Sequence, residues 1–177
     1  MSRVWTKRIL YAALALLFLG QHPGVVQARA AQSVRERFVG TWRLVVDENI
    51  SREGKVTYPD VGPHGVGYLI YAPDGHMCVG LMNPDRPKWK EPREPTEKEK
   101  IALFDSFYAY CGRYEINEAE HVMMHLPEMA STPDYVNSKQ PRPYSFEGDR
   151  VTFSGPELAP QGGTYRIVWE KVPSPQQ

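Results

Sequence analysis

A glycine and a tryptophan two residues apart, Gly40 and Trp42, stand at the head of a segment in which apolar and polar side chains alternate. The apolar positions are Trp42, Leu44 and Val46, and they alternate with Thr41, Arg43, Val45 and Asp47. A period of two residues predicts a β-strand with one buried face. Such a face must be covered by other elements, so the chain has to supply a sheet.

The same alternation recurs along most of the chain, between segments typical of turns. Pro73-Asp74-Gly75 predicts a tight turn, because proline presets its own φ and glycine accepts a positive φ, and Gly148-Asp149 predicts a second hairpin. The further predicted strands are Val66 to Ala72, His76 to Met82, Phe107 to Asn117, Glu120 to Leu126, Pro143 to Glu147, Arg150 to Ser154 and Gly163 to Lys171. About eight strands predict an all-β fold, an antiparallel up-and-down β-barrel, with an open sandwich as the alternative.

A charged, proline-rich stretch from Asn83 to Pro95 interrupts the strands and predicts a loop, with Lys88-Trp89-Lys90 at its centre. A loop of this length is either a lid over the barrel mouth, a contact with an anionic surface, or a plain connection whose tryptophan covers part of a helix. Thr96 and Glu99 have the spacing of a capping box. We therefore expect one short helix from Thr96 to about Asp105, packed over the sheet.

The first 30 residues have the pattern of a cleavable export signal. They carry Arg3, Lys7 and Arg8 near the start, no acidic residue, and an apolar run from Ile9 to Gly20. That run is shorter than the roughly 20 residues that a membrane-spanning helix needs. Small residues at Ala28-Arg29-Ala30 predict cleavage after Ala30 and a periplasmic or secreted protein without a stable membrane anchor; an uncleaved amphipathic anchor is the alternative.

Charge and motif content exclude several classes of function. Without residues 1–30 the chain keeps 17 basic and 21 acidic residues, a formal charge of −4, which argues against nucleic acid as a partner. The segment 31–177 has the length of one domain. We find no phosphate-cradling glycine loop, nucleophile elbow or paired carboxylates, so hydrolase and nucleotide-dependent activities have little support. We expect no cofactor, and the oligomeric state stays open.

Two cysteines, Cys78 and Cys111, remain after the predicted cleavage. Export would place them in an oxidising compartment, and their spacing does not fit a metal site. If they lie directly opposite each other on the outer faces of two strands, a disulfide can form, whereas a register slip of two residues would forbid it. Both outcomes stay open.

Several short motifs follow one another in order along residues 36–172. They are Phe38-Val39-Gly40-Thr41-Trp42, Gly67-Tyr68-Leu69-Ile70-Tyr71, Pro73-Asp74-Gly75-His76-Met77, Leu81-Met82-Asn83-Pro84-Asp85-Arg86-Pro87, Tyr110-x-Gly112-x-Tyr114, Glu147-Gly148-Asp149-Arg150-Val151 and Trp169-Glu170-Lys171. Together they resemble the lipocalin-like domain family of bacteria and fungi. The resemblance implies a lipocalin-like barrel, closed at one end by the Gly-x-Trp motif, with a cup for a small apolar molecule. It implies little about chemistry, because most members have no assigned activity.

Four tyrosines are candidate ligand-binding residues: Tyr68, Tyr108, Tyr110 and Tyr114. The last three share one face of the strand predicted from Phe107 to Asn117, and we expect that face to point inward. A cavity with phenols and apolar walls suits a ligand that has an aromatic or polyene body and one polar end. The same rings would equally fill a solid barrel, with their hydroxyls bonded to backbone groups or trapped water.

Two histidines and an arginine complete the candidate site. His121 and His125 would lie about 13 Å apart along one strand face, so they cannot share a metal ion, and we predict no metal site. His125 is either an acid–base group, the weak candidate for catalysis, or a hydrogen-bonded wall residue. Arg142, between two prolines, either fixes the carboxylate of a fatty-acid-like ligand or lies on the rim with its head in water.

Three functions are compatible with these residues. The first is an exported carrier that binds a small lipophilic molecule inside the barrel. The second is an isomerase or cyclase that acts on a hydrophobic substrate by acid–base chemistry through His125 or a tyrosine. The third is a structural or interaction module with a solid barrel. A hollow interior would exclude the third function, and a histidine in contact with a tyrosine hydroxyl or Arg142 would favour the second.

Overall fold

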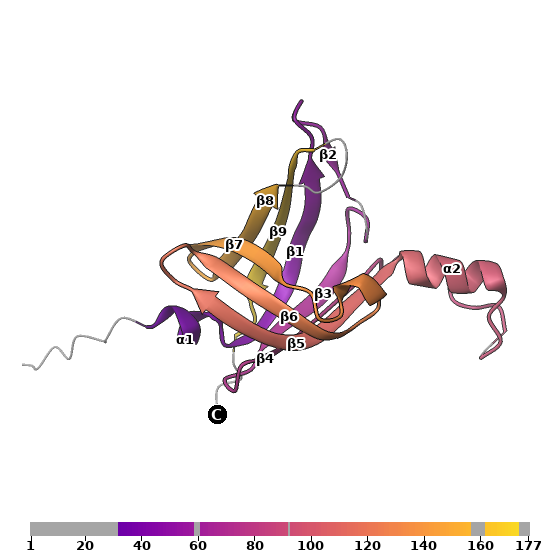
Figure 1. Cartoon of the computed structure of the whole chain (residues 1–177). Helices are drawn as coiled ribbons and strands as arrows, with labels where there is room; N and C mark the ends of the chain where they lie inside the picture. The colour runs from indigo at the N-terminus through magenta and orange to yellow at the C-terminus, as the bar shows by residue number, and fades with distance from the viewer. Residues whose placement is uncertain (1–31, 59–60, 92, 157–161, 174–177) are drawn as a thin grey trace, which may run out of the picture. The chain divides into compact units, whose positions relative to one another are not determined.

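The antiparallel sheet closes on itself because β1 (Gly40–Ile50) pairs with β3 (Val66–Tyr71) on one side and with β9 (Thr164–Lys171) on the other. The computed structural model describes residues 32–58, 61–91, 93–156 and 162–173 (Figure 1). The remaining strands are β2 (Val56–Thr57), β4 (His76–Met82), β5 (Phe107–Asn117), β6 (Val122–Ala130), β7 (Gln140–Glu147), β8 (Arg150–Pro156). Eight strands form the barrel and β2 is an extra one, which confirms the predicted fold class.

The tyrosine face of β5 points into the barrel, as the alternation predicts. Tyr110 and Tyr114 are each 4 % exposed, and Gly112 between them is buried. Glycine is required there because β6 bulges opposite it, and a Cβ atom at Gly112 would overlap the carbonyl oxygen of Leu126. The bulge thus brings the backbones of β5 and β6 close together in the middle of the wall.

The predicted alternation of inward and outward side chains along β1 is correct only as far as Leu44. A bulge at Val45 leaves Leu44 opposite Trp169 and Val46 opposite Val168, so one extra residue is inserted. One extra residue turns the rest of a strand over, and Asp47 consequently takes a buried position that the simple alternation gives to the outer face. The prediction that Val46 shares the inner face of Trp42 is wrong for this reason.

One end of the barrel is closed by α1 (Val34–Phe38), a five-residue helix that the sequence analysis did not predict. Ser33 and Glu36 form a capping box, and Phe38 at the end of the helix is fully buried. The indole nitrogen of Trp42 donates to the Phe38 carbonyl oxygen at 2.7 Å. The ammonium of Lys171 donates to the carbonyl oxygens of Arg37 and Val39, each at 2.6 Å, and so caps the helix C-terminus.

The one helix that the sequence predicts forms as α2, but its environment differs from the expected one. α2 (Glu97–Asp105) begins with the capping box of Thr96 and Glu99, but it buries no residue. Ile101 and Phe104 are 56 % and 60 % exposed, so the expectation that α2 packs over the sheet is wrong; it extends beyond the start of β5 (Figure 1). None of the helices in the described ranges combines the length and apolar character that crossing a bilayer requires.

A disulfide links Cys78 of β4 to Cys111 of β5. The two residues are direct partners in the antiparallel register, and their Cα atoms are 4.1 Å apart. The bridge is the outcome expected for zero register slip. The predicted signal segment and the cleavage after Ala30 lie outside the described residues.

The strand predicted from Pro143 begins earlier, because β7 includes Pro141 and Pro143. The amide of Tyr144 donates to His121 on the β6 side, and alternate residues of an antiparallel strand point their N–H groups the same way. Pro141 and Pro143 therefore occupy the positions whose N–H groups would face β8. The pairing of β7 with β6 is not interrupted and begins at Gln140. Within the described residues, pairing of β7 with β8 covers Tyr144–Glu147 alone.

Candidate functional site

His125 lies in the middle of the barrel between two tyrosine hydroxyls. The Tyr71 hydroxyl is 2.5 Å from Nε2 and the Tyr110 hydroxyl is 2.6 Å from Nδ1. The three side chains come from β6, β3 and β5, and each is at least 96 % buried, with exposures of 2 %, 1 % and 4 %. Both ring nitrogens are therefore satisfied inside the fold.

Burial decides the protonation states of this triplet. Burial, with a smaller contribution from the positive Arg142, lowers the pKa of His125 well below its usual value, so the imidazole is neutral near pH 7. Burial also raises the pKa of Tyr71 and Tyr110, which keeps both phenols protonated. A neutral imidazole has one donor and one acceptor nitrogen, so one phenol donates to the ring and the other accepts from it.

Arg142 projects inward from β7, close to the tyrosines of the end opposite α1. It is partly buried, and its guanidinium carbon lies 5.5 Å from the centre of the Tyr165 ring. Burial acts to lower the pKa of Arg142, but the surrounding phenols of Tyr110, Tyr135 and Tyr165 raise it overall. No ion pair found among the described residues includes Arg142.

Two phenol hydroxyls beside Arg142, those of Tyr108 and Tyr165, are buried and make no hydrogen bond of good geometry, and the Tyr108 hydroxyl interacts with that of Tyr135. Tyr108 contacts Tyr110 and Tyr135, with ring centres 5.6 Å and 5.4 Å apart. Burial, followed by the neighbouring Tyr135, raises the pKa of Tyr108. A buried hydroxyl without a partner costs about 1–3 kcal/mol, a cost that an acceptor atom of a ligand would offset.

The structure brings four of the six predicted ligand-binding residues together, and these are Tyr108, Tyr110, His125 and Arg142. Tyr68 lies on the outer face and is 56 % exposed, so its expected place in a cavity is wrong. Tyr114 points inward, but at the closed end, where its hydroxyl donates to the Ala72 carbonyl oxygen at 2.8 Å. His121 lies in the turn before β6 with a φ of 54°, away from His125.

Three residues of the arrangement were not anticipated from the sequence. Tyr71 shares its strand with Tyr68 and takes the inward position in its place. Tyr135 belongs to a short 3-10 turn, Pro133–Tyr135, between β6 and β7. Tyr165 lies near the start of β9, where Gly155 of β8 makes room for its ring.

The arrangement can bind an anion and can pass a proton. A guanidinium and the neighbouring phenols offer several donors to a carboxylate or a similar group. Tyr110 connects this group to His125 and onward to Tyr71 through short hydrogen bonds. A neutral histidine can accept a proton at one nitrogen while it releases one at the other.

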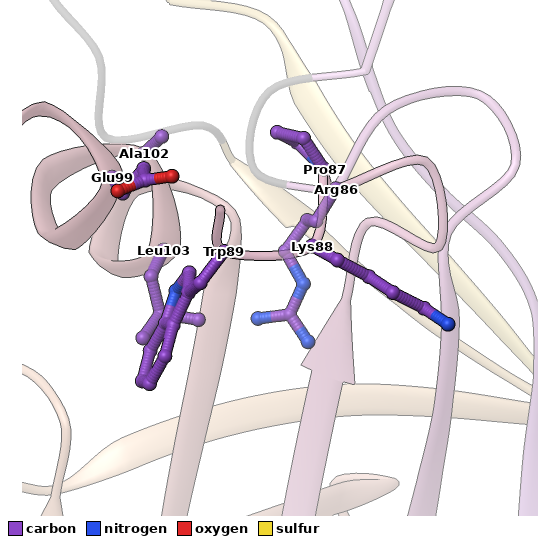
Figure 2. Close-up of a pocket in the computed structure, with 7 residues that line it drawn as sticks. All are labelled: Arg86, Pro87, Lys88, Trp89, Glu99, Ala102 and Leu103. Carbon is purple, nitrogen blue, oxygen red and sulfur yellow. The ribbon is translucent and has the colours of Figure 1, made fainter. Parts of the chain in front are cut away.

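Two hollows lie near this end of the barrel, outside the His125 triplet. One, of about 530 Å³, is bounded by residues 50–52, Pro156 and residues 162–164, next to Tyr165 in the chain. The other, of about 430 Å³, lies between residues 86–89 and α2 (Figure 2). Trp89 is beside Leu103 in this second hollow, so the tryptophan covers part of α2, as one of the three alternatives for the loop expects.

Comparisons with known proteins address the fold. A sequence profile described as the lipocalin-like domain matches residues 39–172. Among solved structures, a lipoprotein YedD from Klebsiella pneumoniae is similar at 11 % sequence identity with a TM-score of 0.34; the similarity covers 76 % of this chain and 70 % of that chain. No curated protein matches this chain.

Proposed function

This chain belongs to the lipocalin-like domain family, and from that premise we propose that it is an exported carrier of a small amphiphilic acid. The ligand's acidic group binds Arg142 inside the barrel, and its apolar body lies against the surrounding tyrosine rings. The observation that carries the proposal is a partly buried guanidinium outside every ion pair of the described residues, whose neighbours are the neutral phenols of Tyr108, Tyr110, Tyr135 and Tyr165.

Electrostatics favour an anion over a neutral ligand. The guanidinium keeps its charge at any physiological pH, and burial near aromatic rings strengthens its interaction with a carboxylate. The nearby phenols are neutral donors because their pKa values are raised. A ligand carboxylate would therefore be surrounded by hydrogen-bond donors. It would not have to displace a protein carboxylate from Arg142, because no ion pair of the described residues includes Arg142.

Export is supported by two independent features. The N-terminal 30 residues have the composition of a signal peptide. The Cys78–Cys111 disulfide is the state that an oxidising compartment maintains. Together they support a periplasmic or secreted carrier.

Binding of a fluorescent fatty acid tests the proposal. A dansyl-labelled undecanoic acid should bind the parent protein, and Arg142→Gln should weaken binding about tenfold or more, because a charge-assisted contact is lost. Arg113→Gln is the matched control, since Arg113 is exposed and pairs with Glu128 on the outer surface. A labelled undecanol of the same length should bind both proteins equally. Equal acid binding by the parent and Arg142→Gln would contradict the role of Arg142.

A second observation favours acid–base catalysis as an alternative. The hydrogen-bonded series from Tyr71 through His125 to Tyr110 ends beside Arg142, so a proton could move to or from a bound acid. Conversion of a 3-alkenoic acid to the conjugated 2-alkenoic acid needs only removal of a proton at C2 and delivery at C4. Absorbance of the conjugated product measures it. His125→Gln should abolish turnover and keep binding; absence of turnover in the parent protein leaves the carrier function alone.

A solid barrel that binds nothing is the third alternative. The half next to α1 supports it, because large rings fill that half. Native mass spectrometry of protein purified gently from its own host distinguishes the two cases. A co-purifying acidic, apolar mass is expected for the carrier, and its repeated absence would favour the module.

A further inference from the structure

The wall of the barrel is incomplete beside Arg142. β7 begins at Gln140 and β8 ends at Pro156, yet the ladder between these strands starts only at Tyr144 and Phe153. Continuing the register would place Pro143 opposite Ser154 and Arg142 opposite Gly155. Those pairs are not formed, although β7 still pairs with β6, and β8 with β9, along the same stretch.

The two prolines explain why the gap occurs here. They stand where the N–H groups of β7 would face β8, because the Tyr144 amide faces β6. A proline has no N–H to donate, so two of the ladder hydrogen bonds cannot form. Gly155 of β8 has no side chain, and the Tyr165 ring occupies the position where one would lie.

The inner end of this gap is the candidate anion site. Arg142 belongs to the unpaired stretch itself and points inward, with the Tyr165 ring on its β9 side. Further inside, the barrel is filled by His125, Phe153 and the aromatic residues of the closed end. A ligand that reaches Arg142 therefore cannot run deeper, and its apolar chain has to extend back toward the surface.

We propose that amphiphilic acids enter through the side of the barrel, between the proline-containing start of β7 and the end of β8. The acidic group moves in first and binds Arg142, and the chain stays in the gap. This rests on the proposed carrier function and specifies its ligand class as single-chain acids. Chains longer than the gap should gain little further affinity, because their ends lie outside the barrel.

Cross-linking the gap tests the side entrance. In Pro143→Cys/Ser154→Cys, both new side chains alternate outward with respect to Arg142 and Phe153, and the parent chain has no free cysteine among the described residues. One sample is joined by a short bis-maleimide and the other is capped with N-ethylmaleimide. Stopped-flow mixing with the dansyl-labelled undecanoic acid should show association and dissociation at least tenfold slower in the joined sample.

The matched control is Ser145→Cys/Thr152→Cys, two residues further along each strand, where the ladder is already complete. Joining this pair should change the rates less than twofold. Because Pro143→Cys itself restores an N–H toward β8, the capped sample is also compared with the parent protein, and slower rates in the capped sample support the side entrance. Equal rates in the parent, capped and joined samples would overturn the side entrance and indicate access through the barrel mouth. A parent protein that does not bind the probe would overturn the carrier function itself, and the entrance with it.

A second variant avoids chemical modification. Pro141→Val/Pro143→Val restores both N–H donors and should extend the β7–β8 ladder. Protection of the two new amides from hydrogen exchange, measured against the unfolded variant, reports the extension, and it should accompany slower binding of the same probe than in the parent protein. An extended ladder with unchanged binding rates would also overturn the proposal.

Discussion

The two ends of the barrel treat their cationic side chains in opposite ways, although the end covered by α1 also has a buried hydroxyl without a partner, that of Tyr144. At the end covered by α1, the indole of Trp42 and the ammonium of Lys171 donate to carbonyl oxygens of the helix. At the other end, Arg142 forms no ion pair among the described residues, and its neighbours are neutral phenols, among them the buried Tyr165 hydroxyl without a partner. The first arrangement stabilises the fold, whereas the second leaves donors for a ligand. Substitutions at the two ends should therefore differ in what they change.

The largest effect is expected at the closed end. Trp42→Ala should lower the free energy of unfolding by about 3–5 kcal/mol, because a buried indole leaves a cavity and its hydrogen bond is lost. Urea denaturation followed by circular dichroism measures it. Trp89→Ala is the control, since Trp89 is 39 % exposed and should cost little. A loss below about 1 kcal/mol for Trp42→Ala would show that this end is not the stabilising one.

The His125 triplet, between the two ends, should make stability depend on pH. The unfolded chain protonates this histidine below about pH 6.5, whereas burial keeps it neutral in the barrel, so the unfolded state binds more protons. Stability should fall as the pH drops below 6.5, by up to ~1.4 kcal/mol per pH unit. Urea midpoints between pH 7 and 5 measure the slope.

Two controls assign that slope to His125. His125→Gln should be nearly flat over the same range. Hydrogen bonds from the capping residues Ser33 and Thr96 lower the pKa of Glu36 and Glu99 below 4.5, so their contribution is lost only at lower pH. An equal slope in the parent protein and His125→Gln would contradict the buried, neutral histidine.

A smaller effect is expected for the cap of α1. Lys171→Met keeps an apolar side chain of similar length but removes the ammonium that lies 4.4 Å from the centre of the Trp42 ring, and it leaves the carbonyl oxygens of Arg37 and Val39 without their donor. The free energy of unfolding should fall by about 1–2 kcal/mol, and the amides of α1 should exchange faster in hydrogen-exchange mass spectrometry. Lys88→Met, at an exposed position, should change neither quantity. Unchanged exchange in α1 would contradict the capping role of Lys171.

The smallest effect on stability is expected at Arg142. Arg142→Met removes a partly buried charge that no carboxylate of the described residues balances, so stability should change by less than about 1 kcal/mol or rise. Ligand binding should be lost at the same time. Thermal melts with and without the fatty-acid probe measure both. A large destabilisation without ligand would place Arg142 with the stabilising residues of the other end.

The barrel could be predicted from the sequence because its signals are local. Turn residues such as Pro73-Asp74-Gly75 mark the hairpins, and alternation marks which β5 tyrosines point inward. The bulge at Val45 escaped prediction, since an extra residue in a strand leaves no mark in the alternation of side-chain types. Pro143 was interpreted as the start of a strand, but β7 begins at Gln140. A proline's missing N–H interrupts pairing only with the strand toward which that N–H would point, and this is β8 rather than β6.

The candidate site could be predicted only in part, because some of its residues carry no local signal of where they point. Both faces of the strand at Tyr68 and Tyr71 carry apolar side chains, so the sequence did not distinguish the inward tyrosine from the outward one. Tyr135 comes from a connection between strands, and only the closed barrel brings it to Arg142. The exposed apolar residues of α2 could not be anticipated, because helical periodicity normally indicates burial.

The disulfide also determines how the chain tolerates damage. Cys78 and Cys111 lie on either side of the segment from Asn83 through α2 to Ser106, in which α2 buries no residue. A protease that cuts anywhere in this segment produces two fragments that remain covalently joined, with the strand ladder between β4 and β5 intact. The segment can thus be nicked, lengthened or exchanged for another sequence while the wall that carries Tyr110 keeps its register.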